Sequence, residues 1–295
     1  MRTYSFVTVD VFTDRRFGGN QLAVFPEASG LSDAEMQDLA AEFNLSETTF
    51  VLPPADAAHT ARVRIFNTTA EMPFAGHPNV GTGYVLARLG RASSDVLLFE
   101  ELAGIVEVEV SRGTDGTPTG ARISAPQPLS LGTELPVDAI AACAGLAVSD
   151  ISTAAHPPMV VSVGNPFVVA EVAGEALSAA APDVGAFRRT VEATPALQGR
   201  LALYLYTQEG DRLRARMFAP LAGTFEDAAT GSAACPLAAL RLSLSGGERG
   251  AFDIVQGVEM GRPSLLQASA WRATDGIRAS VGGGCVPVLR GEVEL

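Results

Sequence analysis

Short motifs in the first half of the chain recur in the same order in the second half. Gly19–Val24 resembles Gly164–Val169, and Arg64–Phe66 resembles Arg216–Phe218, at separations of about 145 and 152 residues. Solenoids and propellers repeat with periods of only ~20–50 residues, so this spacing favours two copies of one large unit. We predict halves at residues 1–125 and 126–295, with the last strand able to cross back to the first half. The Pro-rich, non-periodic stretch 126–136 is expected to be a linker.

Each half contains one helix that is apolar on nearly every face. The two stretches, 79–89 and 233–244, consist mostly of Ala, Val, Leu and Gly. A helix that is apolar all round is buried, so each should lie inside its half. Pro236 is expected in the first helical turn, where its missing N–H costs nothing.

Both apolar helices start in glycine-containing turns that carry an ionisable residue, His77 in one and Asp227 in the other. The first N–H groups of a helix lack intrahelical partners and carry partial positive charge. A substrate carboxylate could satisfy them at such a buried start. The alternative is an ordinary capped helix, with Thr230 or Ser232 as the N-cap.

An acidic residue also stands where a helix meets a strand. Residues 32–43 read as a helix with Ser32 and Glu35 in a capping-box pattern and Asn44 as its terminator. Glu47 then precedes the apolar run Phe50–Leu52, which predicts partial burial. Burial raises the pKa of a carboxyl group toward the range useful for proton transfer. The alternative is an ordinary glutamate at a strand edge.

The amino-acid composition excludes several kinds of partner and reactive site. The net charge is −12 and all 21 basic residues are Arg, which disfavours nucleic acid as a partner and excludes Schiff-base and P-loop lysines. The three His and three Cys are scattered, so no metal site is expected. No long apolar run or signal peptide is evident, so we expect a soluble cytoplasmic protein without a membrane partner.

Several motifs occur together in a characteristic order. They are Phe17–Asn20, Leu22–Val24, Asn44–Thr48, Pro73–Pro78, Glu226–Ala233, Gln256–Gly257 and Met260–Ser264. In this combination the chain resembles the PhzF-like phenazine-biosynthesis isomerase family over essentially its whole length. It departs at Ala228, where the family usually has proline after the acid.

The resemblance implies an α+β fold of the diaminopimelate-epimerase type. Two pseudo-symmetric halves would each wrap a curved mixed sheet around a central apolar helix, with the active site in the cleft between them. It also implies a homodimer and no cofactor. The family's reaction is a proton relocation on trans-2,3-dihydro-3-hydroxyanthranilate, a small cyclic carboxylate.

Carried over by position, the resemblance assigns roles to individual residues. Glu47 would be the general acid/base, and His77 and Asp227 would contact and polarise the substrate. The expected substrate-binding residues are Ser46, Gly76, Gly231 and Ser232.

Two other readings remain open. The chain could be a non-catalytic protein that binds a small carboxylate on the same fold, or an epimerase or racemase of an amino-acid-like substrate. Cysteine-pair racemases on this fold place one thiol at each helix start, whereas this chain has Ala75 at one turn and Ala228 and Ala229 at the other. Cys235 is expected to be a small core residue.

Overall fold

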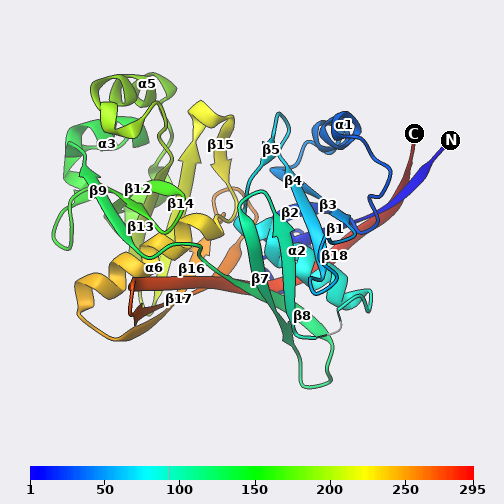
Figure 1. Cartoon of the computed structure of the whole chain (residues 1–295). Coiled ribbons are helices and arrows are strands. Elements are labelled where there is room, and N and C mark those ends of the chain that lie inside the picture. Colours follow the sequence, from blue (N-terminus) through cyan, green and yellow to red (C-terminus); the bar gives the residue numbers. More distant parts are fainter. Residues whose placement is uncertain (93) are drawn as a thin grey trace. The chain divides into compact units, whose positions relative to one another are not determined.

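A computed structural model describes residues 1–92 and 94–295 (Figure 1). The chain divides into two compact units, which are described separately. Unit 1 comprises Met1–Ser124 and Gly282–Leu295, and unit 2 comprises Ala125–Val281. The chain thus has a mixed α+β fold in which the long last strand contributes residues to each unit.

The strands of unit 1 form a closed ring. Its elements are β1 (Thr3–Val11), β2 (Asn20–Phe25), α1 (Asp33–Phe43), β3 (Glu47–Leu52), β4 (Ala61–Phe66), β5 (Glu71–Met72), α2 (Gly76–Arg88), β6 (Val96–Glu101), β7 (Gly104–Arg112), β8 (Pro118–Ser124) and part of β18 (Gly276–Glu294). Pairing runs β1–β2–β3–β4–β6–β7–β8–β18 and returns from β18 to β1. The pairs β2–β3 and β4–β6 are parallel, and β5 adds to β4.

Helix α2 is buried among these strands. It contacts β1, β2, β3, β7 and β8, and its residues from Gly76 to Ala87 are all buried. Small residues make this enclosure possible. A Cβ atom on Gly81 would come within 2.5 Å of the Leu22 side chain, and one on Gly83 within 2.6 Å of Val108. The predicted burial of this helix is therefore confirmed, although the helix begins at Gly76 rather than at residue 79.

Unit 2 also combines strands and α-helices, and it contains short 3-10 helices, labelled η. Its elements are β9 (Ser130–Glu134), α3 (Val137–Ala144), η1 (Val148–Asp150), β10 (Ile151–Ser152), β11 (Met159–Ser162), β12 (Pro166–Val172), α4 (Gly174–Ala179), α5 (Val184–Ala193), η2 (Pro195–Leu197), β13 (Leu203–Glu209), β14 (Arg212–Ala219), η3 (Pro220–Ala222), β15 (Thr224–Asp227), α6 (Gly231–Ser245), β16 (Arg249–Gln256), β17 (Ser264–Ala273) and the start of β18.

The order of strand pairing in unit 2 repeats that of unit 1. Strand β12 lies parallel to β13, β13 is antiparallel to β14, and β14 carries the short β15 on one side and a parallel β16 on the other. Helix α6 lies between β15 and β16 in sequence, as α2 lies between β5 and β6. It contacts β11, β12, β16 and β17, and most of its residues are buried.

Further helices pack on the outside of each unit (Figure 1). Helix α1 has the predicted capping box of Ser32 and Glu35, and it ends at Asn44 in the left-handed conformation with φ 50°. Its apolar face packs on Phe25, Phe50 and neighbouring side chains of unit 1. In unit 2, α3 and α5 cover β12 and β13 with a separate apolar cluster.

Two sequence expectations were wrong. The stretch 126–136 is not a plain linker, because Ser130–Glu134 forms β9 and pairs with β11. All five of its side chains are exposed, so backbone pairing orders this strand and leaves no apolar periodicity to detect. Pro236 lies in the interior of α6 rather than in its first turn, because the helix already begins at Gly231. Among the described residues, no helix is long and apolar enough to span a membrane.

Candidate active site

The structure brings Glu47 and His77 together in unit 1. Glu47 is the first residue of β3, and His77 is the second residue of α2. Their side chains are 18% and 6% exposed, and Oε2 of Glu47 lies 3.5 Å from Nε2 of His77. A hydrogen bond of 2.9 Å between the hydroxyls of Thr49 and Thr82 joins β3 to α2 and so helps to fix this pair.

His77 is held in its neutral form. Burial lowers the pKa of its imidazole to about 3, and a hydrogen bond with the Gln21 backbone opposes this only in part. Nδ2 of Asn20 lies 3.4 Å from Nδ1 of His77. His77 is therefore poorly suited to store a second proton.

The start of α2 has no side-chain cap. Ala75 occupies the N-cap position and offers no hydrogen-bonding side chain, so the N–H groups of the first turn, from Gly76 onward, have no side-chain acceptor there. Ser46 is exposed at the residue before Glu47. An uncapped helix start beside a carboxylate and a neutral imidazole can bind and polarise a small polar ligand.

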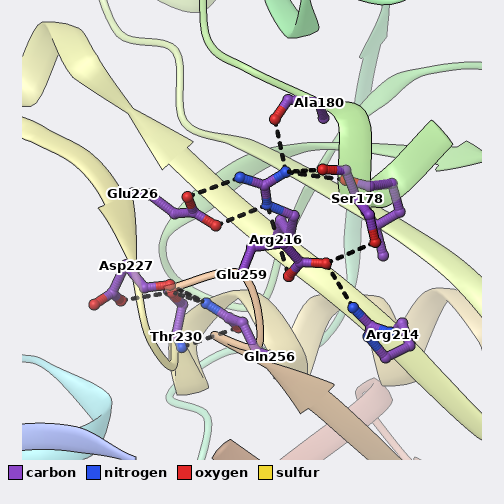
Figure 2. Close-up of polar contacts among 10 residues, drawn as sticks. Ser178, Ala180, Arg214, Arg216, Glu226, Asp227, Thr230, Gln256 and Glu259 are labelled. Carbon is purple, nitrogen blue, oxygen red and sulfur yellow. Dashed lines mark hydrogen bonds and ion pairs between the residues drawn. The ribbon is translucent and has the colours of Figure 1, made fainter. Parts of the chain in front are cut away.

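Unit 2 holds Asp227 in a hydrogen-bonded turn (Figure 2). Asp227 ends β15, and the hydroxyl of Thr230 donates to its Oδ2 at 2.6 Å. Thr230 occupies the N-cap position of α6 but makes no side-chain cap bond to the helix. The capping role considered for Thr230 is therefore wrong, because its hydroxyl is used to orient Asp227.

Gln256, at the end of β16, fixes the same turn. Its Nε2 donates to the Asp227 carbonyl at 2.8 Å and to the Thr230 hydroxyl at 3.0 Å. Its Oε1 accepts from the Thr230 backbone N–H at 3.2 Å and from the Tyr204 hydroxyl at 3.1 Å. All these residues except Asp227 are buried, so the turn is held in one conformation.

The residues after Gln256 support the turn through its backbone. The Ser264 hydroxyl donates to the Ala228 carbonyl at 2.9 Å. Gly257 has φ +75°, and a Cβ atom there would lie 2.5 Å from the carbonyl oxygens of both Ala228 and Arg262. Only glycine fits such a position without strain. The motifs Gln256–Gly257 and Met260–Ser264, for which the sequence gives no role, thus hold the turn that carries Asp227.

Helix α6 begins directly after this turn. Gly231 is buried and Ser232 is half-buried, both in the first helical turn. Cys235 is a buried residue within the helix and does not stand at its start. The turn thus combines an oriented carboxylate with a helix N-terminus that has no side-chain cap.

Glu101 was missed by the sequence reasoning. It ends β6, and both of its carboxylate oxygens are buried. Burial raises its pKa to about 8, and a hydrogen bond with Asn79 of α2 opposes this only in part. The preceding Glu100 behaves oppositely, since hydrogen bonds from Asp56, Ala55 and His59 lower its pKa to about 2. Adjacent identical residues on a strand give no local signal of which one is buried.

Within residues 1–92 and 94–295, no three His, Cys, Asp or Glu side chains group in a way that could hold a metal ion.

Comparison with known proteins identifies the family. The family model described as phenazine biosynthesis-like protein, PhzC-PhzF, matches residues 9–291. An isomerase of Mesorhizobium japonicum is 39% identical over 280 residues, covering 90% of each chain. The trans-2,3-dihydro-3-hydroxyanthranilate isomerase of Pseudomonas fluorescens is 38% identical over 299 residues, covering 99% of this chain and 100% of that one.

Solved structures show the same fold. A PhzF-family protein of Bacillus anthracis superposes with a TM-score of 0.89 at 22% identity, covering 100% of both chains. A hydroxyproline epimerase of Agrobacterium vitis superposes with a TM-score of 0.63 at 14% identity, covering 100% of this chain and 93% of that one. The chain belongs to the PhzC-PhzF family of phenazine biosynthesis-like proteins, and it is an isomerase.

Proposed function

We propose that the chain is a cofactor-independent isomerase that relocates a proton on a small cyclic carboxylate. The substrate class is trans-2,3-dihydro-3-hydroxyanthranilate or a related compound, as the name of the Pseudomonas fluorescens relative suggests. The observation that carries the proposal is the placement of Glu47 against a neutral His77 in unit 1. Glu47 is the proposed general acid/base.

The chemistry of the pair supports a single proton carrier. A neutral His77 can donate a hydrogen bond to developing negative charge from its protonated ring nitrogen. It does not readily become imidazolium, because its pKa lies near 3. Glu47 is then the group that takes a proton from one substrate carbon and returns it to another. General acid–base catalysis of this kind contributes ~10²–10⁴-fold.

The turn of unit 2 supplies a complementary set of groups. We propose that the N–H groups at Gly231 and Ser232 bind the substrate carboxylate, since a helix N-terminus favours an anion. Asp227, oriented by Thr230, would contact the substrate's amino or hydroxyl group. Ser46 and Gly76 would complete the binding residues of unit 1. The repeated order of strand pairing suggests that the two units are copies of one ancestral unit.

The homodimer that the resemblance implies and the cytoplasmic location expected from the sequence remain predictions for this chain. Light scattering on the purified protein would measure its mass against the 30.6 kDa of one chain. A mass of one chain at micromolar concentration would argue against the dimer.

A cysteine-based epimerase is disfavoured for this chain. Ala75, Ala228 and Ala229 occupy the turns at which such an enzyme needs thiols, and Cys235 is buried within α6. A non-catalytic carboxylate-binding protein would need the helix starts but would have no need of the Glu47–His77 contact. If the chain is such a non-catalytic binding protein, it should bind the ligand and catalyse no proton exchange.

The test is proton exchange in heavy water. The purified protein is incubated with trans-2,3-dihydro-3-hydroxyanthranilate, or with other small cyclic carboxylates, and deuterium incorporation is followed by NMR. We expect conversion with deuterium uptake by the wild type and by Glu42→Gln, an exposed glutamate on α1 that serves as the control. Glu47→Gln should abolish both while it still binds the carboxylate. Wild-type exchange by Glu47→Gln would remove Glu47 from the mechanism, and binding without exchange by the wild type would favour the non-catalytic alternative.

A further inference from the structure

Each unit contains an arginine–glutamate pair at the same place in its strand order. Arg64 on β4 faces Glu71 on β5, and Arg216 on β14 faces Glu226 on β15. Strand β5 has two residues and β15 has four, so neither has much pairing of its own. Both strands lead directly into the turns that precede α2 and α6.

In unit 2 the contact is bidentate (Figure 2). Nε and Nη2 of Arg216 donate to the two carboxylate oxygens of Glu226 at 2.8 and 2.9 Å. The third nitrogen, Nη1, donates to the carbonyls of Leu177 and Ala180 at 3.0 and 2.6 Å. The guanidinium also lies over the Phe218 ring, 4.8 Å from its centroid. Arg216 therefore has little freedom to move.

The unit 1 pair has the same form. Nε and Nη2 of Arg64 donate to the two oxygens of Glu71 at 2.7 and 2.6 Å. The guanidinium lies 5.0 Å from the centroid of the Phe66 ring, and Nη1 donates to Asp33 of α1. In both units, then, an arginine two residues before a phenylalanine forms a bidentate ion pair with a glutamate on the neighbouring short strand.

Stability alone does not account for such pairs. Removing two charges from water is costly, and a buried ion pair often contributes no more stability than apolar residues of the same volume. The side chains of Arg216 and Glu226 are only 7% and 13% exposed. What a planar, bidentate contact does supply is a fixed geometry.

The residue held in unit 2 is next to a proposed site residue. Glu226 immediately precedes Asp227, so fixing the Glu226 side chain fixes the last residues of β15 from one side. Gln256 and Thr230 hold the turn from the other side. Asp227 thus lies between two anchored points.

We propose that Arg216 and Glu226 are positioning residues that set the orientation of the Asp227 carboxylate during isomerisation. Arg64 and Glu71 do the same for the turn that leads to His77. This inference rests on the proposed role of Asp227, and it adds residues that act on the reaction without touching the substrate.

The test uses Arg216→Lys, which keeps the charge and loses the bidentate contact. Because small misplacements of a reacting group cost up to ~10²-fold in rate, we expect kcat to fall about 10- to 100-fold with KM nearly unchanged. The Arg216→Lys protein should also unfold at a lower temperature, because the Leu177 and Ala180 carbonyls lose donors, so kcat is measured well below that temperature. Arg212→Met is the control, because Arg212 lies on the same strand and its ion pair with Asp253 is long, 3.9 Å, and exposed. This control should leave kcat unchanged.

A double-mutant comparison separates positioning from general weakening. If Arg216 acts through Asp227, then Arg216→Lys should cause no further loss in an Asp227→Asn background, with slow turnover followed by deuterium exchange. Losses that multiply, or an Arg216→Lys variant with wild-type kcat, would overturn the inference. Should Arg216→Lys fail to fold, Glu226→Gln is used in the same comparison and is expected to give the same pattern.

Failure of the proposed function looks different. If Asp227→Asn or Glu47→Gln alone retains wild-type turnover, the assigned site is wrong whatever the arginine variants do. If both abolish turnover and Arg216→Lys does not change it, only the positioning inference fails.

Discussion

Replacing Glu101 by glutamine should change how the stability of the protein depends on pH. In the folded chain the pKa of Glu101 is raised from 4.5 to about 8, mainly by burial. Between these values the native state keeps a proton that the unfolded state releases, so the wild type loses stability as the pH rises. Glutamine keeps the shape of the protonated acid and cannot ionise, so the loss should disappear in Glu101→Gln.

The size of this effect follows from the shift in pKa. Each pH unit between 4.5 and 8 removes about 1.4 kcal/mol, and the whole range removes about 5 kcal/mol as an upper bound. Most of it should be visible between pH 5 and pH 8. Above pH 8 the folded protein also ionises and the difference between the two proteins should become constant. The energy is large because both oxygens of Glu101 are buried.

Urea denaturation at a series of pH values measures the effect. The free energy of unfolding is determined for the wild type, for Glu101→Gln and for Glu109→Gln, an exposed glutamate on the neighbouring strand β7. We expect the difference between wild type and Glu101→Gln to grow with pH, and the Glu109→Gln curve to run parallel to the wild type. Parallel curves for all three proteins would show that Glu101 is not a buried acid with a raised pKa.

Three further predictions concern His77, the turn that carries Asp227, and helix α6. Burial lowers the pKa of His77 to about 3 in the folded protein, so the unfolded state binds more protons below pH 6.5. The free energy of unfolding of the wild type should therefore fall as the pH is lowered from 6.5. In the same urea series, His77→Asn should show a weaker dependence on pH. Gly257→Ala should cost at least ~1–2 kcal/mol and lower kcat, because its φ of +75° and the nearby Ala228 and Arg262 carbonyls exclude a Cβ atom; an unchanged unfolding midpoint would contradict this. Cys235→Ala should retain turnover, because Cys235 is buried within α6, and loss of proton exchange in a folded Cys235→Ala protein would revive a thiol mechanism.

Structural features that depend on residues close together in the sequence could be predicted. The capping box of Ser32 and Glu35 and the burial of the two apolar helices depend on residues close in sequence. The position of β9 could not be predicted, because its order comes from pairing with β11, a partner distant in sequence. An exposed strand has no alternation of apolar and polar residues from which its pairing could be predicted.

Some residues of the candidate site could likewise be predicted from the sequence, and others could not. Glu47, His77 and Asp227 stand in motifs that can be recognised, and the structure places the first two 3.5 Å apart. The partners that hold Asp227 were missed, because Gln256 lies 26 residues beyond Thr230 and only the strand order brings them together. Glu101 was missed because the burial of its carboxylate arises only when the chain has folded around the end of β6.

The course of β18 has a consequence for how the protein folds. Its later residues pair with β1 along the whole of that strand, from Thr3 with Glu294 to Val11 with Cys285. During synthesis β1 emerges first among the strands and β18 last, with all of unit 2 made in between. One edge of β1 therefore lacks its pairing partner until β18 has been synthesised. Contacts so distant in sequence are slow to form, so the ring of unit 1 should close late, after unit 2 has had time to fold.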